Sequence, residues 1–222
     1  MASAALLPPF AFFGWVYFSN AEQIGKVTAE HRAKTARLDA LCNAVRIDIR
    51  RRTARAKSVL FPQSTNATFP MLQDLDFIEI KQGSWKTTSG APYDRLQKKP
   101  NEPIFINGNL NVVRQGVEQP ESEYEVSTKP IASEADRSMN LHMEETTVFD
   151  RRTNEVLAVF TLAFEFQSVV TKDSRFCPNG FEYAAYQREV PSYVLGLMDE
   201  KASRKFEERL AALKGQVSRS TK

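Results

Sequence analysis

Residues 141–170 decide the fold, and they read LHMEETTVFDRRTNEVLAVFTLAFEFQSVV. Two stretches rich in Thr, Val and Phe, residues 141–149 and 155–170, flank the polar residues 150–154. The polar stretch has the composition of a hairpin loop, so the pattern predicts two antiparallel strands joined by a tight connection.

The second of these strands has two different faces. Side chains alternate along a strand, so one face would carry Val159, Thr161, Ala163, Glu165 and Gln167, and the other Phe160, Leu162, Phe164, Phe166 and Ser168. One heavily apolar face and one mixed face are typical of an antiparallel sheet packed on a single side. We interpret the aromatic residues as core rather than as a ligand site.

Further elements extend on both sides of this hairpin. Short β-like runs separated by Gly, Pro or Asn lie at residues 75–80, 103–106, 110–117, 123–128 and 181–186. A helix is predicted to begin at Pro191, with apolar residues at helical spacing up to Leu213 and Gly215 as its stop. The fold class we predict is α+β, with an N-terminal anchor helix, an antiparallel sheet of about five to seven strands and a C-terminal helix.

The N-terminus is uncharged from Met1 to Ala21 and rich in aromatic residues. A membrane-spanning helix needs about 20 apolar residues, with a range of roughly 17–25, so this segment just qualifies. Pro8 and Pro9 are tolerated only in a first helical turn. A cleaved signal peptide would need a basic start, which is missing. The other alternative is an apolar arm packed on the domain or on a partner, and we predict a membrane anchor over residues 1–21.

A basic segment follows the anchor. Residues 22–57 contain ten basic and four acidic residues, a net charge of +6, whereas residues 58–222 carry −3. Apolar residues at helical spacing predict a helix to about residue 44, followed by a stretch that fits helix or strand equally. The predicted division is therefore an anchor (1–21), a basic helix and linker (22–57), a β-rich domain (58–189) and a C-terminal helix and tail (190–222).

Six basic side chains are candidates for contact with an anionic surface, and they are Arg46, Arg50, Arg51, Arg52, Arg55 and Lys57. Anionic lipid headgroups attract such residues with about 1 kcal/mol each. Nucleic acid is disfavoured, because no aromatic residues for base stacking are interleaved with them. A solvated face of a structural segment is the alternative.

Motifs for catalysis or cofactor binding are missing from the sequence. It contains no phosphate-binding loop, dinucleotide fingerprint, H-E-x-x-H or C-x-x-C motif. Two cysteines and two histidines exclude a disulfide-rich mini-protein and a zinc site built mainly from Cys and His. We place His31 in the basic helix, interpret His142 as a structural or exposed histidine, and predict no catalytic, cofactor-binding or metal-binding residue. Asn66 begins a glycosylation acceptor motif, which matters only in a eukaryotic secretory context.

The two cysteines, Cys42 and Cys177, would close a loop of 136 residues if they were bonded in an oxidising compartment. Two unrelated thiols in a reducing compartment are the alternative. Two observations predict opposite sides of the membrane for the domain. Basic residues that follow the anchor, beginning with Lys26, favour a cytoplasmic domain, whereas a disulfide requires the opposite side.

A resemblance rests on residues 150–158 (DRRTNEVLA), on Phe176-Cys177-Pro178 and on the earlier cysteine just beyond an anchor. These features resemble a loose group of bacterial single-pass membrane proteins, whose β-rich domain faces outward from the inner membrane. The resemblance implies a periplasmic domain, but that group has no established activity to transfer. This sequence departs from the pattern because no basic residue precedes the anchor.

Together these observations predict a membrane-anchored, non-enzymatic binding or assembly subunit. Its expected partners are membrane lipid through residues 1–21 and another protein, and a small-molecule ligand is not identified. The alternatives are an enzyme whose site is assembled from scattered carboxylates and hydroxyls, or a binder of anionic lipid or nucleic acid through the basic segment.

Overall fold

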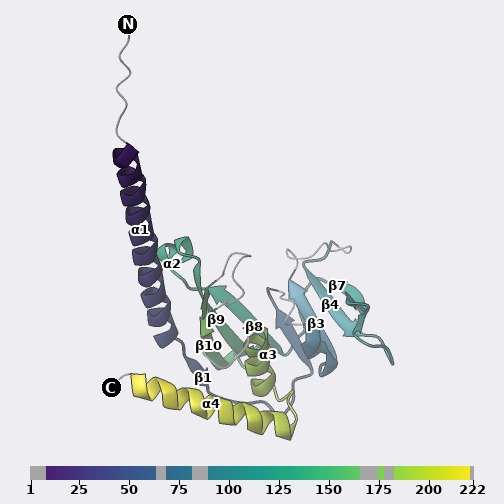
Figure 1. Cartoon of the computed structure of the whole chain (residues 1–222). Coiled ribbons are helices and arrows are strands. Elements are labelled where there is room, and N and C mark those ends of the chain that lie inside the picture. Colours follow the sequence, from purple (N-terminus) through teal and green to yellow (C-terminus); the bar gives the residue numbers. More distant parts are fainter. Residues whose placement is uncertain (1–8, 64–68, 82–89, 166–174, 178–182, 221–222) are drawn as a thin grey trace. The chain divides into compact units, whose positions relative to one another are not determined.

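The computed structural model describes residues 9–63, 69–81, 90–165, 175–177 and 183–220 (Figure 1). The chain divides into two compact units, Met1–Ala40 and Leu41–Lys222. The helices are α1 (Pro9–Asn43), α2 (Glu134–Ser138), α3 (Tyr183–Val194) and α4 (Glu200–Ser220), with a short 3-10 helix, η1 (Phe69–Gln73). The strands are β1 (Ile47–Ile49), β2 (Ser58–Phe61), β3 (Phe77–Lys81), β4 (Tyr93–Lys98), β5 (Phe105–Ile106), β6 (Asn109–Leu110), β7 (Val112–Val117), β8 (Tyr124–Pro130), β9 (Leu141–Asp150), β10 (Glu155–Glu165) and β11 (Phe176–Cys177).

The first unit consists, in its described part, of α1 as far as Ala40. The helix itself ends at Asn43, close to its predicted end at about residue 44. The first eight residues of the predicted anchor lie outside the described residues. Among the residues that the structure describes, no helix is both long enough and apolar enough to cross a membrane.

The second unit is built on a mixed sheet of nine strands in the order β1-β10-β9-β8-β2-β3-β4-β7, with β11 also paired to β10. The predicted α+β class is confirmed, but the prediction of five to seven antiparallel strands is wrong. Strand β2 pairs in parallel with both β3 and β8. Its sequence, SVLF, is buried at all four positions, as expected for a central parallel strand covered on both faces.

The hairpin of β9 and β10 is confirmed. Asn154 has a φ of 59° at the end of the turn, a conformation that asparagine adopts more readily than most residues. The pairing shifts by one residue between Val156 and Ala158, which is a β-bulge. From Phe160 to Phe164 every side chain on β10 is buried, so the face predicted to be mixed is covered as well.

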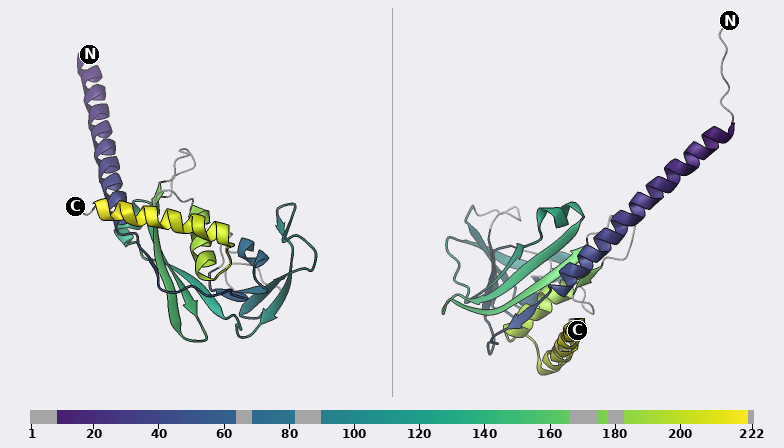
Figure 2. Two further views of the ribbon diagram at one scale, coloured as in Figure 1. Left: turned by 90° about the horizontal axis from the view of Figure 1, so that it is seen from below. Right: turned by 90° about the vertical axis from the view of Figure 1, so that its left-hand side faces the viewer.

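The apolar face of the sheet packs against α3 and α4, as two views show (Figure 2). Residues Tyr186, Val190 and Val194 recur every four positions along α3 and are fully buried. The ring of Tyr186 meets the ring of Phe160 edge-on, with centroids 5.3 Å apart. From α4, the fully buried Phe206 reaches the same core.

Three predictions about the C-terminal region are wrong. Residues 183–186 are helical rather than a strand, while residues 181 and 182 lie outside the described part. Pro191 lies inside α3 instead of starting a helix, because the burial of its neighbours Val190 and Val194 offsets the loss of one backbone donor. Helix α4 continues through Gly215, since one glycine costs only about 1 kcal/mol in a helix interior.

The turn between α3 and α4 brings two backbone segments into close contact. Gly196 has a φ of 66°, and a Cβ atom at this position would lie 2.4 Å from the carbonyl oxygen of Ala54. On either side, the amide of Thr53 donates to Val194 and the amide of Ala56 donates to Leu195, both at 2.8 Å. Only glycine fits this contact without a shift of the backbone.

Candidate functional site

The two ends of the sheet differ in how their strand edges are covered. We call the side of β10 that β1 and β11 cover the protected edge. At the opposite end β7 pairs with β4 and, within the described residues, with no other strand, and we call its outer side the open edge. Unpaired strand edges bind other strands readily, so the open edge is the first candidate for a binding surface.

The open edge carries few of the features that discourage strand pairing. Strand β7 reads VVRQGV, with a single charge at Arg114, and its Val113 is 46% exposed. In the register with β4, Gln115 lies opposite Arg95 and Arg114 lies opposite the buried Leu96. Even-numbered residues of β7 therefore share the face of the core, and odd-numbered residues share the other face.

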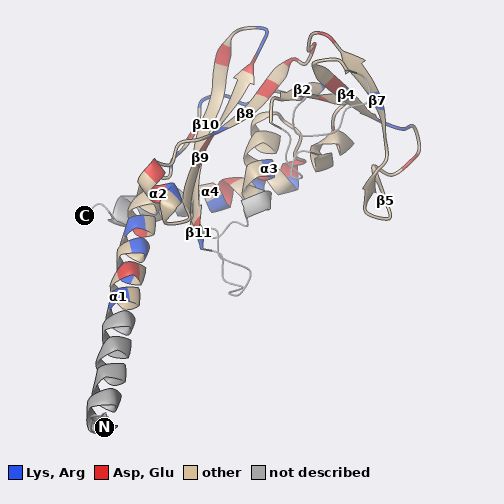
Figure 3. Ribbon diagram, turned by 90° about the horizontal axis from the view of Figure 1, so that it is seen from above, with Lys and Arg blue, Asp and Glu red and all other residues tan. Residues whose placement is uncertain are grey.

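An apolar hairpin immediately precedes β7. Strands β5 and β6 are joined by Asn107 and Gly108, whose φ values of 51° and 79° fit a two-residue turn with both residues left-handed. Phe105 and Ile106 are 41% and 43% exposed. Residues 103–113 contain no charged side chain, and the hairpin is drawn without a charged residue in Figure 3.

The base of this hairpin is fixed although its tip is exposed. Ile104 is buried, and its carbonyl oxygen accepts a 2.6 Å hydrogen bond from the amide of Asn111. The side-chain amide of Asn111 donates to the carboxylate of Glu102 and to the carbonyl oxygen of Pro103. The exposed apolar side chains are thus held at a defined position beside the open edge.

A buried ion pair stabilises the strands next to the open edge. Glu79 on β3 is fully buried, and its Oε1 accepts hydrogen bonds from Nε and Nη2 of Arg95 at 3.1 and 2.7 Å. Its Oε2 accepts from the amide and the hydroxyl of Ser122 at 2.8 and 2.6 Å. Arg95 also contacts Glu121 and lies over the ring of Phe77 at 4.5 Å.

The protonation of Glu79 argues against acid–base chemistry at this pair. Burial raises the pKa of Glu79, but hydrogen bonds from Ser122 and Arg95 lower it, and the net pKa lies below its ordinary value. The carboxylate is therefore ionised at neutral pH, and both of its oxygens already accept two hydrogen bonds. Such a group serves as a structural acceptor rather than as a proton donor.

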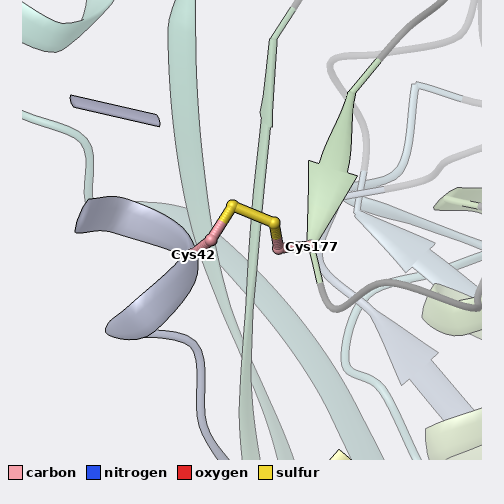
Figure 4. Close-up of a disulfide and its surroundings, with 2 residues drawn as sticks. All are labelled: Cys42 and Cys177. Atoms are coloured by element: carbon pink, nitrogen blue, oxygen red, sulfur yellow. A yellow bond between two sulfur atoms is a disulfide. The ribbon is translucent and has the colours of Figure 1, made fainter. Parts of the chain in front are cut away.

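The protected edge is held covalently. Cys42 and Cys177 form a disulfide with a Cα–Cα distance of 5.3 Å, which decides between the two alternatives for these cysteines in favour of the bond (Figure 4). Cys42 lies in the last turn of α1, just before β1, and Cys177 lies in β11. The bond therefore links the two chain segments that cover β10.

Most of the predicted anionic-surface residues are engaged with acidic partners. Their carboxylate contacts are Arg46 with Glu145 at 2.8 Å, Arg50 with Asp48 at 3.0 Å, Arg51 with Glu155 at 3.0 Å and Arg52 with Glu207 at 3.5 Å. Arg52 also lies 3.9 Å from the ring centroid of Tyr193. Arg55 and Lys57 are exposed. These ion pairs reduce the positive charge that the segment offers to an anionic surface.

The remaining candidates do not form a reactive cluster. His142 stacks on Phe164 with ring centroids 5.2 Å apart, and His31 lies in α1. No group of three His, Cys, Asp or Glu residues suited to a metal is found within the described ranges. Asn66 of the glycosylation motif lies outside those ranges.

No family model matches this chain, no curated protein matches its sequence, and no solved structure matches it. The resemblance to bacterial membrane proteins therefore rests on its short motifs alone.

Sequence reasoning missed the open edge as a site. The run 110–117 was predicted as a strand, but nothing local says which strand ends a sheet, because that depends on pairing with distant residues. A signal was nevertheless present. An Asn-Gly turn inside eleven uncharged residues, 103–113, marks an apolar hairpin that reaches the surface.

Proposed function

We propose that this protein is a non-enzymatic binding or assembly subunit that engages a protein partner through the open edge and the hairpin β5–β6. The observation that carries the proposal is that Phe105, Ile106 and Val113 are exposed in an uncharged stretch that leads into β7, a strand whose outer side no other described strand covers. Edge strands bind partners through backbone hydrogen bonds, and adjacent apolar side chains add specificity.

The buried ionisable groups favour binding over catalysis. Glu79 is saturated with hydrogen bonds from Arg95 and Ser122. Asp150 is held by Arg152, whose guanidinium donates to both of its carboxylate oxygens. Hydrogen bonds from Arg152 lower the pKa of Asp150 more than burial raises it, so this carboxylate is also an ionised acceptor.

We further propose that the domain lies in an oxidising compartment, such as the periplasm of a bacterium, and is held at the membrane by residues 1–21. The disulfide between Cys42 and Cys177 favours this side, because cytosolic thiols are kept reduced. The proposed tether is based on the sequence from Met1 to Ala21, which has no charged residue and is rich in apolar ones. The hydrophobic effect favours the transfer of such a segment from water into the hydrocarbon of a membrane.

The binding proposal is tested by photo-crosslinking in intact cells. A photoreactive residue is placed at Ile106 or Val113 of the full chain, and at Asp48 of β1 as the control on the protected edge. We expect discrete adducts of defined mass from Ile106 and Val113 and none from Asp48. The same pattern of adducts at all three positions, or no adducts at any, would overturn the proposed surface.

The compartment and the tether are tested separately. A membrane-impermeant thiol reagent is added to intact cells with and without prior reduction, and labelling is expected only after reduction. The full chain is then sedimented without detergent and is expected in the membrane fraction. Labelling only after lysis would place the domain on the cytosolic side, and a fully soluble chain would refute the tether.

A further inference from the structure

We propose that the partner at the open edge is a second copy of this chain, with the two β7 strands paired antiparallel about a two-fold axis at Gln115. This inference rests on the proposed binding function and names its partner. It follows from the sequence and exposure of β7, which is complementary to itself in one register.

Symmetry restricts the possible registers. A two-fold axis perpendicular to the sheet keeps each side chain on its own face, so even-numbered residues must lie opposite even-numbered ones and odd opposite odd. The exposed residues of β7 are Val113, Arg114 and Gln115. An axis at Val113 would pair only residues 112–114 of the two β7 strands, whereas an axis at Arg114 pairs residues 112–116 and an axis at Gln115 pairs residues 113–117. An axis at Arg114 would place two arginines directly opposite each other, which is unfavourable.

The register centred on Gln115 removes this conflict. It places Val113 opposite Val117 of the second copy and Arg114 opposite Gly116, which has no side chain. Gln115 lies opposite its own counterpart, and amide side chains can both donate and accept hydrogen bonds. Within one copy, neighbouring strands place Glu79, Arg95 and Gln115 side by side. This row of side chains would continue into the second copy across the seam, by which we mean the contact between the two β7 strands.

Charges are also complementary in this register. Glu118 follows β7, is exposed, and lies opposite Val112 of the second copy. Its diagonal neighbour across the seam is Arg114, and such neighbours are about 7–8 Å apart at Cα, within reach of long side chains. Symmetry forms this pair twice. The apolar hairpins, which precede β7 in each copy, then lie at the two ends of the seam.

Engineered cysteines test the register. The chain has no cysteine besides the two in the disulfide, so one introduced thiol reports on one position. Gln115→Cys places thiols on the axis, where opposite Cβ atoms are about 4.5–5.5 Å apart, and is expected to form a covalent dimer on mild oxidation. Arg114→Cys is the matched neighbour and Asp48→Cys the protected-edge control, and neither is expected to form a dimer.

Charge reversal tests the complementarity. Arg114→Glu and Glu118→Arg, each alone, turn two attractive pairs into two repulsive ones, and we expect the dimer dissociation constant of the full chain in detergent to rise about tenfold or more. The double variant Arg114→Glu/Glu118→Arg is expected to restore the dimer. Analytical ultracentrifugation measures all three against the unchanged chain, and circular dichroism checks that each variant is folded.

The outcomes separate this inference from the function on which it rests. Covalent dimers from Arg114→Cys but not Gln115→Cys, or no rescue in the double variant, would refute the register. A full chain that stays monomeric at all concentrations would refute the second copy as partner. If the chain is monomeric but Val113 forms adducts with a different protein, the proposed binding function is still supported. If Val113 forms no adducts, both the second copy as partner and the proposed binding function are refuted.

Discussion

At one end of the sheet the eleven-residue strand β10 is covered by two short strands, whereas at the other end no strand among the described residues pairs with the outer side of the six-residue strand β7. At the protected edge a disulfide links the last turn of α1, just before β1, to β11, and the charged side chains of Asp48 and Arg50 accompany β1. Short strands and charges discourage pairing with other chains. The open edge has only one charged residue in its strand, Arg114, and the strands behind it are held by the buried pair of Glu79 and Arg95. The difference indicates that one end of the sheet serves stability and the other is available for binding.

The largest effect should come from the protected edge. Replacing Cys42 and Cys177 by serine releases a loop of 136 residues, and the entropy model assigns such a crosslink about 5 kcal/mol of unfolding free energy. Urea unfolding of the double variant against the oxidised chain measures this loss. A reductant should destabilise the unchanged chain similarly and leave the double variant as it was. Equal unfolding midpoints for the two proteins would show that the protected edge does not depend on its covalent link.

Next in size is the buried pair behind the open edge. Glu79→Ala leaves the largely buried Arg95 without its main partner, and the loss of a buried partner costs about 3–5 kcal/mol. Glu121→Ala is the matched control, because Glu121 contacts the same Arg95 but is 72% exposed, and its loss should cost no more than about 1 kcal/mol. Urea unfolding measures both, and similar losses from the two variants would contradict a special role for burial.

A third effect distinguishes two glycines with similar backbone conformations. Gly196→Ala, beside Ala54 in the segment that leads to β2, should cost toward the upper end of the 1–3 kcal/mol range that is typical of strained left-handed residues, or roughly 3 kcal/mol. Gly90→Ala, just before β4, has a φ of 69° but no atom within 4 Å of its added Cβ, so only about 1 kcal/mol is expected. Thermal or urea unfolding of the two variants compares them, and an equal cost would mean that the contact with Ala54 relaxes freely.

The protected edge was more predictable from sequence than the open edge. Residues 141–165 alternate clearly and carry their own turn, so the β9–β10 hairpin follows from local patterns. The disulfide was one of two alternatives for the cysteines, because sequence does not bring Cys42 and Cys177 together. Only the fold places both at the side of β10.

Strands β2 and β4 were not predicted, and in both cases the weakness of the sequence pattern has a physical reason. Strand β2, SVLF, has three consecutive apolar residues after Ser58 and no alternation, as parallel central strands often have. Strand β4, YDRLQK, looks polar because Arg95 within it neutralises the buried Glu79 on β3. A buried charge pair between residues far apart in the sequence has no local pattern. The parallel pairing, and with it the open edge, therefore lay beyond local reasoning.

The smallest expected effect is on how stability depends on acid pH. It tests Glu79, behind the open edge, with a substitution that keeps the size of the side chain. The pKa of Glu79 is lower in the folded chain than its ordinary value of about 4.3, since hydrogen bonds from Ser122 and Arg95 outweigh the effect of burial. Its contribution to stability is thus complete above the unfolded pKa and is lost as the pH falls through the folded pKa. Glu79→Gln cannot ionise, so its unfolding free energy should fall less steeply between about pH 5 and pH 3 than that of the unchanged chain. Urea unfolding across this range measures the two slopes, and the residual slope of the variant reflects Asp150 and Glu145, whose pKa values are also lowered. Parallel slopes would mean that folding does not lower the pKa of Glu79, and the ionised form of Glu79 would then add nothing to the stability of the sheet behind the open edge.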